Sequence, residues 1–301
     1  MTGNEGSYHP SGRRSGSHTL VLGRPPGRRP AEEGWIAMTD AVPEAVIAEL
    51  EDPFAQLTGS LADTRKLHFE VTSTSLLTPH MQRLELTAAE LDGFTYQPGQ
   101  DVMLLVDVEG RRPVRRRYTI RQLDSVSRRL TLDVVLHGDG PGERWIRSAR
   151  PGDRIEGIGP RGKVFPSPAA DWHLFMGDEA ALPAMLAMTE SLPGDSVATL
   201  VVEVPEAGDE QELSAPARTR ISWLHRLDRP AGDPAALVAE AREVELPAGS
   251  GHAYLLGEAS VVLAMREALA ARGMPQDQMS PKAYWGRGRA NGGHGEPARD
   301  S

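Results

Sequence analysis

The sequence predicts a two-domain protein in which a small antiparallel β-barrel precedes an α/β domain built on a parallel sheet. Three observations support this fold class. The chain has 301 residues, which suits two domains of ordinary size. Up to residue 167, short apolar or alternating segments are separated by Gly and Pro turns, as in small barrels. From residue 168, apolar strands alternate with helical segments, which indicates βαβ units.

The barrel is expected to have six strands, because six segments before residue 167 have strand character. Apolar residues alternate with polar ones in most of them, which is the pattern of a strand with one buried face. Segment 102–108 is instead a continuous apolar run. A Gly-Pro-Gly turn at 140–142 opens a helix that ends near residue 148. The expected strands are 67–71, 81–86, 102–108, 116–123, 129–136 and 153–158.

The α/β half is expected to contain five strands and three main helices. No Gly-x-Gly-x-x-Gly fingerprint is present, so its glycines alone do not predict dinucleotide binding. Ligands of such sheets bind at the carboxyl ends of the strands. The expected strands are 173–176, 197–204, 220–224, 253–256 and 279–285, and the helices end near 191 or span 234–242 and 260–272.

The predicted domain boundaries follow from composition. Residues 1–62 are read as a mostly disordered leader with a short helix near 42–50, because 1–34 are rich in Gly, Ser, Pro and Arg. A basic run at 24–29 could also be a nucleic-acid arm, but disorder is the favoured reading, and Met38 is an alternative start. The barrel domain is expected over 63–167, the α/β domain over 168–289 and a disordered tail over 290–301.

Composition excludes several function classes. The net charge of −9 and the pI of about 5.5 argue against nucleic-acid binding. The chain has no cysteine, which excludes disulfides, thiolate zinc sites and cysteine-ligated iron–sulfur clusters. No apolar run reaches the ~20 residues of a membrane span, and no secretory signal is recognised. We expect a cytoplasmic monomer. No permanent metal site is expected, since the nine histidines show no ligand spacing.

The segment 116–121 and the segment 137–145 form the strongest candidate site. Alternate strand residues point the same way, so Arg116 and Tyr118 share one face of a strand while Arg117 and Thr119 share the other. The glycine-rich turn that follows opens a helix whose free backbone N–H groups suit an anion. An aromatic platform beside a pyrophosphate cradle is what a flavin dinucleotide requires.

The ordered series of motifs resembles the siderophore-interacting protein family, a branch of the ferredoxin-reductase-like flavoproteins. The resemblance extends over roughly residues 65–289. It implies an NAD(P)H-dependent ferric-siderophore reductase. The matching segments are 78–83, Arg-x-Tyr-Thr-x-Arg at 116–121, His-Gly-x-x-Gly-Pro-x-x-x-Trp ending at 145, Gly-Pro-Arg-Gly at 159–162, and those at 177–184, 223–226, 257–260 and 284–285.

The resemblance also implies site residues and ligands. It makes 63–167 an FAD-binding domain and 168–289 an NAD(P)H-binding domain, with FAD as the cofactor, NADH or NADPH as the donor and a ferric siderophore as the substrate. Arg116 would pair with the pyrophosphate, Tyr118 would pack on the isoalloxazine ring and Thr119 would hydrogen-bond near its N5 atom. Lys282 and Arg287 would bind the siderophore, and no catalytic acid, base or nucleophile is expected. The other expected cofactor-binding residues are Arg121, His137, Gly140, Pro141, Gly142, Trp145, Asp178, Glu179 and Ala180.

Two residues depart from the family pattern. Glu143 stands where a small residue is common, and its carboxylate would repel a pyrophosphate unless it turns outward or pairs with Arg147. Ala180 replaces a threonine, so a hydroxyl contact is lost. These departures leave two alternatives open: a general flavin oxidoreductase of the same fold, and a siderophore-binding module without catalysis. His137 and Trp145 could also be structural residues, and Arg111 and Arg112 a solvated hairpin.

The donor is expected to be NADH rather than NADPH. Residues 205–212, which follow the second strand of the α/β half, supply four carboxylates and no base. A 2′-phosphate would meet like charge there, whereas a 2′-hydroxyl could donate to a carboxylate such as Glu203. Arg218 and Arg220 could overturn this expectation by folding back onto the acidic segment.

Overall fold

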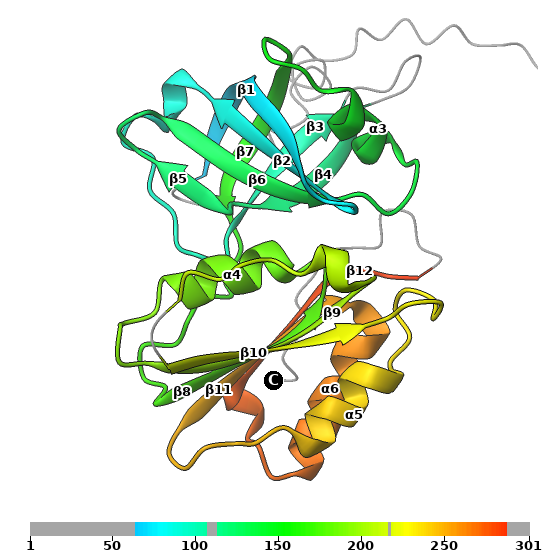
Figure 1. The fold of residues 1–301 in the computed structure, drawn as a ribbon. Coiled ribbons are helices and arrows are strands. Elements are labelled where there is room, and N and C mark those ends of the chain that lie inside the picture. Colours follow the sequence, from blue (N-terminus) through cyan, green and yellow to red (C-terminus); the bar gives the residue numbers. More distant parts are fainter. Residues whose placement is uncertain (1–63, 107–112, 216–217, 288–301) are drawn as a thin grey trace, which may run out of the picture. The chain divides into compact units, whose positions relative to one another are not determined.

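The computed structural model describes residues 64–106, 113–215 and 218–287. Its first half is one curled antiparallel sheet in the order β4-β3-β7-β1-β2-β6-β5, shown in Figure 1. The predicted leader, the tail, Arg111 and Arg112 lie outside the described residues. The elements of this half are β1 (Arg65–Thr78), β2 (Met81–Thr87), η1 (Ala89–Leu91), β3 (Asp101–Val106), β4 (Val114–Thr119), β5 (Gln122–Asp124), β6 (Arg129–Val135), α3 (Pro141–Ser148) and β7 (Arg154–Arg161).

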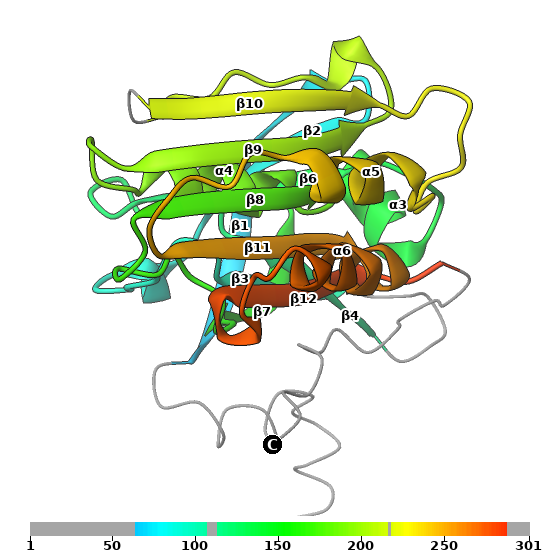
Figure 2. The same ribbon diagram turned by 90° about the horizontal axis from the view of Figure 1, so that it is seen from below.

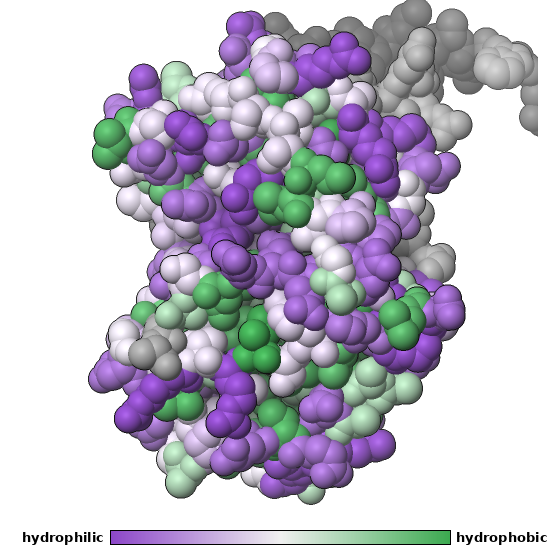
Figure 3. Space-filling view, in the orientation of Figure 1, coloured by the Kyte–Doolittle hydropathy of each residue, from purple (hydrophilic) through white to green (hydrophobic). Residues whose placement is uncertain are grey.

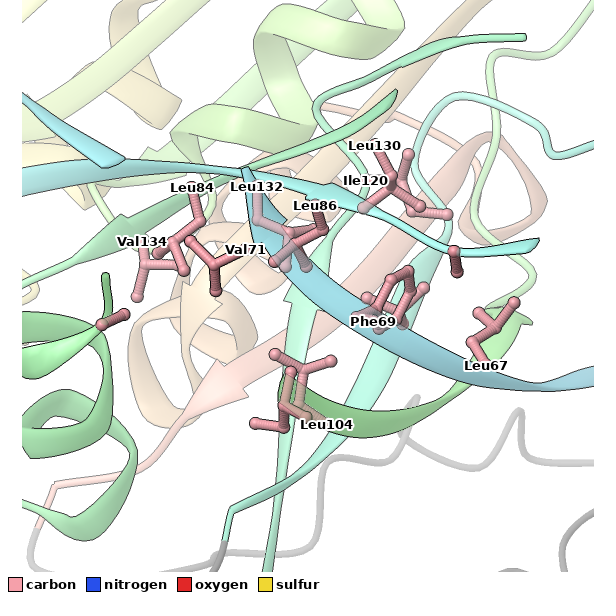
Figure 4. Packing of buried hydrophobic residues seen from close by; sticks show 14 of the residues in the cluster. Leu67, Phe69, Val71, Leu84, Leu86, Leu104, Ile120, Leu130, Leu132 and Val134 are labelled. Carbon is pink, nitrogen blue, oxygen red and sulfur yellow. The ribbon is translucent and has the colours of Figure 1, made fainter. Parts of the chain in front are cut away.

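Apolar residues alternate with polar ones along the strands, and the apolar side chains form the core of this sheet. Leu67, Phe69 and Val71 lie on one face of β1 and are at most 1% exposed. Side chains from β2, β3 and β6 meet them inside the curl, as Figure 4 shows. Full burial of a Leu or Phe side chain contributes about 1.5–3 kcal/mol, so this cluster is a main source of stability for the curl.

The described part of the sheet has seven strands, so the expectation of six was wrong. The segment predicted as one strand over 116–123 is divided between β4 and β5. β4 pairs with β3, whereas β5 pairs with β6. Ile120 lies at the change of partner and is fully buried, with its amide donating to Gln100 and the next amide donating to Thr131. An apolar residue that fills the core allows the chain to change partners without breaking the apolar pattern.

The second half is a five-stranded parallel sheet in the order β10-β9-β8-β11-β12. Figures 1 and 2 show α4 on one face and α5 and α6 on the other. The predicted strands and helices agree with the structure to within a few residues. The elements are β8 (Trp172–Asp178), α4 (Leu182–Glu190), β9 (Val197–Val204), η2 (Ala207–Asp209), β10 (Arg218–His225), α5 (Ala235–Glu243), β11 (Gly251–Glu258), α6 (Ala259–Ala271), η3 (Gln276–Gln278) and β12 (Met279–Trp285).

Burial differs between the central and outer strands of this sheet. Every residue of β8 is buried, because helices cover both faces of a central parallel strand. β10 is an edge strand with no fully buried residue. Within the described residues, the segment that connects β9 to β10 contains only the short 3-10 helix η2 and no α-helix. The parallel register ends β8, β9, β10 and β11 at one edge, where ligands bind in sheets of this kind.

The two halves share apolar packing. Met81 and Val164 from the first half lie in the same buried cluster as Phe175 and several residues of α4. On the face shown in Figure 3, hydrophobic residues form small patches separated by hydrophilic ones. Among the described helices, none is long and apolar enough to cross a membrane.

Candidate functional site

The first part of the site is a close approach between β4 and the start of α3. Arg116 and Tyr118 project from the same face of β4, as the strand pattern predicted. A Cβ atom at Gly142 would lie 2.8 Å from Tyr118 Oη and 2.9 Å from Arg116 Cγ. Only glycine allows the helix to start this close to the two side chains. Burial raises the pKa of Tyr118, so its hydroxyl stays protonated.

Thr119, the next residue of β4, carries a buried hydroxyl. Its Oγ1 has no hydrogen-bond partner among the described residues. A buried polar atom of this kind is expensive unless a partner is supplied. The helix α3, which approaches β4 at Arg116 and Tyr118, begins with Pro141 after Gly140, and no side chain caps its first amides. The arrangement combines an aromatic face, a guanidinium, uncapped amides and an unsatisfied hydroxyl, which suits a flavin nucleotide.

The Glu143 carboxylate does not prevent an anionic ligand from binding at the start of α3. Its carboxylate accepts a hydrogen bond of 2.5 Å from the Gly138 amide and one of 2.7 Å from Arg147. The side chain is 7% exposed, so it is buried rather than turned outward. The pairing with Arg147 that sequence analysis considered is therefore present, and it neutralises the carboxylate.

Three other residues predicted to bind the cofactor, Arg121, His137 and Trp145, do not lie in the contact between β4 and Gly142. Arg121 donates to both carboxylate oxygens of Glu190 in α4, at 2.6 and 2.7 Å, so its guanidinium already has an anionic partner. His137 is exposed. Trp145 packs against the core of the first sheet, which is the structural reading that sequence analysis kept open.

At the carboxyl edge of the parallel sheet, Asp178 is 4% exposed and accepts three N–H bonds. The donors are the Ala180 amide at 3.0 Å, the Glu258 amide at 2.9 Å and Trp285 Nε1 at 2.8 Å. Burial, followed by the nearby Glu179 carboxylate, raises the pKa of Asp178 to about 7 despite these bonds. The amide of Ala180, the residue that replaces a family threonine, is thus used by Asp178.

An ion-pair network at the same edge was not expected from the sequence. Arg226 donates to both oxygens of Glu179, at 2.7 and 2.8 Å. Glu203 lies 3.5 Å from Arg226 and 3.4 Å from Arg229. The resembling motif at 223–226 included Arg226, but these partners are 23 to 47 positions apart and only the sheet register brings them together.

The cations expected to bind substrate differ in accessibility. Lys282 is 5% exposed, and its Nζ lies 3.4 Å from Asp101 Oδ2 and 5.0 Å from the centre of the Tyr284 ring. Asp101 also accepts two bonds from Arg117, at 2.5 and 3.0 Å. Arg287 is exposed, and it contacts Ala231 O at 2.6 Å. Lys282 is therefore a buried member of an Asp101 cluster rather than a surface lysine.

One cluster of potential metal ligands is present among the described residues. Atoms of His80, Glu206 and Asp209 lie within 4.8 Å of one another. Asp209 already accepts bonds from Thr78 Oγ1 at 2.9 Å and His80 Nδ1 at 2.9 Å. These bonds tie the β1–β2 turn to η2, which accounts for the cluster without an ion. Sequence spacing could not reveal it, because His80 and Asp209 are 129 positions apart.

A curled antiparallel sheet followed by a parallel α/β sheet defines the ferredoxin-reductase-like class of folds. A flavohaemoglobin-like FAD/NAD-binding domain of nitric oxide dioxygenase from Vibrio cholerae shares this fold, with a TM-score of 0.59 at 18% identity over 73% of this chain and 98% of that one. A likeness at this identity shows the fold alone.

Within that class, the chain belongs to the siderophore-interacting protein family. The family's own model matches residues 170–288, and the model of its FAD-binding domain matches residues 103–164. A siderophore utilization protein from T. fusca is 33% identical, with a TM-score of 0.70 over 77% of this chain and 97% of that one.

Two further relatives come from curated proteins. An uncharacterized protein of Mycobacterium tuberculosis is 33% identical in an alignment 260 positions long that covers 75% of this chain and 92% of that protein. The ferric vibriobactin reductase ViuB of Vibrio cholerae is 34% identical over 180 residues, which is 59% of this chain and 66% of ViuB.

Proposed function

We propose that this protein is an NAD(P)H-dependent, FAD-containing ferric-siderophore reductase. The observation that carries the proposal is the cradle at β4 and α3, where Arg116 and Tyr118 meet the glycine that opens a helix. The buried Thr119 hydroxyl, which has no partner among the described residues, fits the same cofactor. The name of ViuB as a ferric reductase supports the assignment of the reaction.

Each residue of the cradle would have one task. Arg116 would bind the pyrophosphate with its planar guanidinium, assisted by the first amides of α3. Tyr118 would pack on the ring system, and Thr119 would donate or accept near N5. Bound FAD supplies the conversion of a two-electron hydride into single electrons, which nicotinamide does not readily perform. The protein itself needs no acid, base or nucleophile for this reaction.

Iron is the substrate, and the number of electrons transferred sets how many ferric complexes one NAD(P)H can reduce. Oxidation of one NAD(P)H to NAD(P)⁺ releases two electrons and one proton. Two ferric complexes each take one electron and become ferrous. Fe(II) is a poorer match than Fe(III) for hard oxygen ligands, so it leaves the siderophore more readily. The chain's role is to dock the complex near the cofactor.

The partly exposed Arg117 and Arg161 of the Asp101 cluster would form the docking surface for an anionic complex. Arg117, Arg161 and Lys282 surround this one carboxylate. Burial, and then the charge of Arg117, lowers the pKa of Arg161, while Asp101 opposes the shift. Arg161 Nε is buried without a hydrogen-bond partner in the described ranges. An excess of positive charge in a partly buried place favours a negatively charged ligand.

The test begins with the colour of the purified protein. We expect an oxidised-flavin absorbance spectrum, or uptake of added FAD, followed by bleaching when NADH or NADPH is added without oxygen. Release of Fe(II) is then measured with a ferrous chelator, using several ferric siderophores and ferric citrate. A protein that takes up no FAD would be the non-catalytic binding module. Equal rates for every ferric chelate would identify a general flavin reductase.

The docking surface is tested separately with Arg161→Gln. Loss of one charged contact should slow reduction of an anionic ferric siderophore about tenfold, whereas bleaching of the flavin by NAD(P)H should be unchanged. Arg154→Gln, at the exposed start of the same strand, is the matched control and should alter neither rate. If Arg161→Gln slows both half-reactions equally, the substitution has damaged the fold and the docking assignment fails.

A further inference from the structure

The strand order of the parallel sheet reverses at β8 and β11. From β8 the chain runs outward through β9 to β10, and it then returns to the other side of β8 with β11 and β12 (Figure 2). Ligands of doubly wound sheets bind where the order reverses, at the carboxyl ends of the strands. Two acids lie at this point, because Asp178 ends β8 and Glu258 ends β11.

The backbone brings Asp178 into close contact with the end of β11. Gly257 has a φ of +131°, and a Cβ atom there would lie 2.5 Å from Asp178 Oδ2. That oxygen accepts bonds from the Glu258 amide and from Trp285 Nε1, and Oδ1 accepts one from the Ala180 amide. The ionised carboxylate therefore has N–H donors on both oxygens, and loss of a proton leaves neither oxygen unsatisfied.

Acids outnumber cations in the group of charged residues around Asp178. Glu203 lies 3.5 Å from Arg226 and 3.4 Å from Arg229, yet its Oε2 has no hydrogen-bond partner among the described residues. Arg226 donates its two short bonds to Glu179 instead. With every group ionised, four acids would face three arginines, so one proton held by an acid balances the charge. The acids are Asp178, Glu179, Glu203 and Glu258, and the arginines are Arg226, Arg229 and Arg287.

Asp178 is the acid best suited to hold that proton at neutral pH. Burial, and then the Glu179 carboxylate, raises the pKa of Asp178 to about 7. Burial also raises the pKa of Glu203, which makes Glu203 the alternative holder. At Glu258, burial is outweighed by hydrogen bonds from Ser260 and its neighbours, which lower the pKa of that carboxyl. The proton is therefore held at the end of β8, where the strand order reverses.

A nicotinamide ring is neutral in NAD(P)H and carries one positive charge once its hydride has left. The adenosine end of a dinucleotide lies over the second strand, here β9, so its nicotinamide end lies toward β8 and β11. We propose that a cationic nicotinamide ring bound at this point releases the Asp178 proton to solvent, and that the ionised carboxylate stabilises the ring. Opposite charges favour each other, so by linkage a rise in pH tightens binding of the oxidised nucleotide. The inference rests on the proposed nicotinamide donor, and a single proton, from carboxyl to water, moves in this step.

The experiment compares two nucleotides that differ in the charge of the ring. NAD⁺ carries the positive ring, and 1,4,5,6-tetrahydro-NAD has a neutral ring that cannot donate a hydride. NADP⁺ is avoided because a 2′-phosphate itself titrates near pH 6. Calorimetry on the full-length protein at pH 6, 7 and 8 gives both affinities, and buffers of different ionisation enthalpy give the number of protons released. Both ligands contain the same adenosine and pyrophosphate, so the effects of these groups cancel.

The affinity for NAD⁺ should rise about tenfold from pH 6 to pH 8. The reason is that a carboxyl with a pKa of about 7 is about one-tenth ionised at the lower pH and about nine-tenths ionised at the higher. About half a proton should be released at pH 7. The affinity for tetrahydro-NAD should not change with pH, because its ring brings no charge.

Variants assign the proton to a residue. Asp178→Asn cannot ionise, so it should bind NAD⁺ with the same affinity at every pH. Glu203→Gln should keep the dependence on pH. Asp124→Asn is the matched control, because Asp124 is exposed and also accepts backbone amide bonds, from Val126 and Ser127, and it should behave as the wild type does.

Equal pH dependence for the two nucleotides, no dependence for NAD⁺, or a dependence that survives in Asp178→Asn would overturn the inference while leaving a nucleotide site in place. Loss of the dependence in Glu203→Gln would also overturn it, by moving the proton to Glu203. If Asp178→Asn binds neither nucleotide, the proton count of the wild type decides. A wild-type protein that binds neither contradicts both the inference and the nicotinamide donor, and FAD uptake by the same sample then shows whether the flavin assignment survives.

Discussion

At the scale of single residues, Arg116 is the most direct test of the cradle. The aliphatic part of its side chain lies beside Gly142, at the start of α3. Arg116→Ala should lose a charge-assisted bond of about 1.5–3 kcal/mol, which weakens FAD binding by one to two decades. Titration of the apoprotein with FAD measures this. Arg115→Ala, on the neighbouring position of β4, should bind FAD normally, and unchanged affinity in Arg116→Ala would refute the pyrophosphate role.

Asp178 should make stability depend on pH. Its pKa in the folded protein is raised to about 7 from an ordinary value of 3.8. Between these values the folded state holds the proton more tightly than the unfolded chain, so the free energy of unfolding falls as pH rises through the window. From pH 5 to pH 8 the loss should be about 2–3 kcal/mol.

Urea denaturation at several pH values compares the wild type with Asp178→Asn, which cannot ionise. The wild type should lose stability relative to the variant as pH rises towards 7, and the difference should level off above it. Parallel profiles would mean that the three N–H donors keep the carboxylate ionised at pH 5.

At the scale of elements, a substitution at the contact between α3 and β4 should weaken FAD binding without lowering the stability of the protein. Gly142→Ala places a Cβ within 3.0 Å of Tyr118 and Arg116, so both side chains must shift. Alanine also favours the helix by up to about 1 kcal/mol. We expect FAD affinity to fall about tenfold or more while the urea midpoint changes little. Gly194→Ala, whose Cβ would meet nothing within 4 Å, should change neither quantity.

The same scale shows what sequence patterns can and cannot predict. Apolar periodicity located β8, α4 and β12 because helices and buried strands leave strong local signals. The division at Ile120 was missed because the apolar pattern continues through a change of partner strand. The faces of Arg116 and Arg117 were predictable from strand alternation. The network of Glu203 with Arg226 and Arg229 was not, because parallel register and burial, not local spacing, bring those groups together.

At the scale of the whole described chain, ion pairs such as Arg121–Glu190 and Lys282–Asp101, together with an apolar cluster, connect the two sheets. Arg121 follows β4, and Glu190 ends α4, so their two short hydrogen bonds join different halves. The cluster that includes Met81, Val164 and Phe175 also contains residues of both halves. Shared packing of this kind predicts that the halves unfold in one transition rather than in two.

Circular dichroism and tryptophan fluorescence should therefore give coincident urea transitions. In a double-mutant cycle, Arg121→Ala and Glu190→Ala should show a coupling free energy of about 1–3 kcal/mol, because both side chains are mostly buried. The Arg154–Glu70 pair, with side chains 82% and 45% exposed, is the matched control. Solvent screens an exposed pair of this kind, so its coupling should be nearly zero. Two separated transitions in the wild type would show that the sheets are stabilised independently, and no coupling between Arg121 and Glu190 would show that this ion pair does not join them.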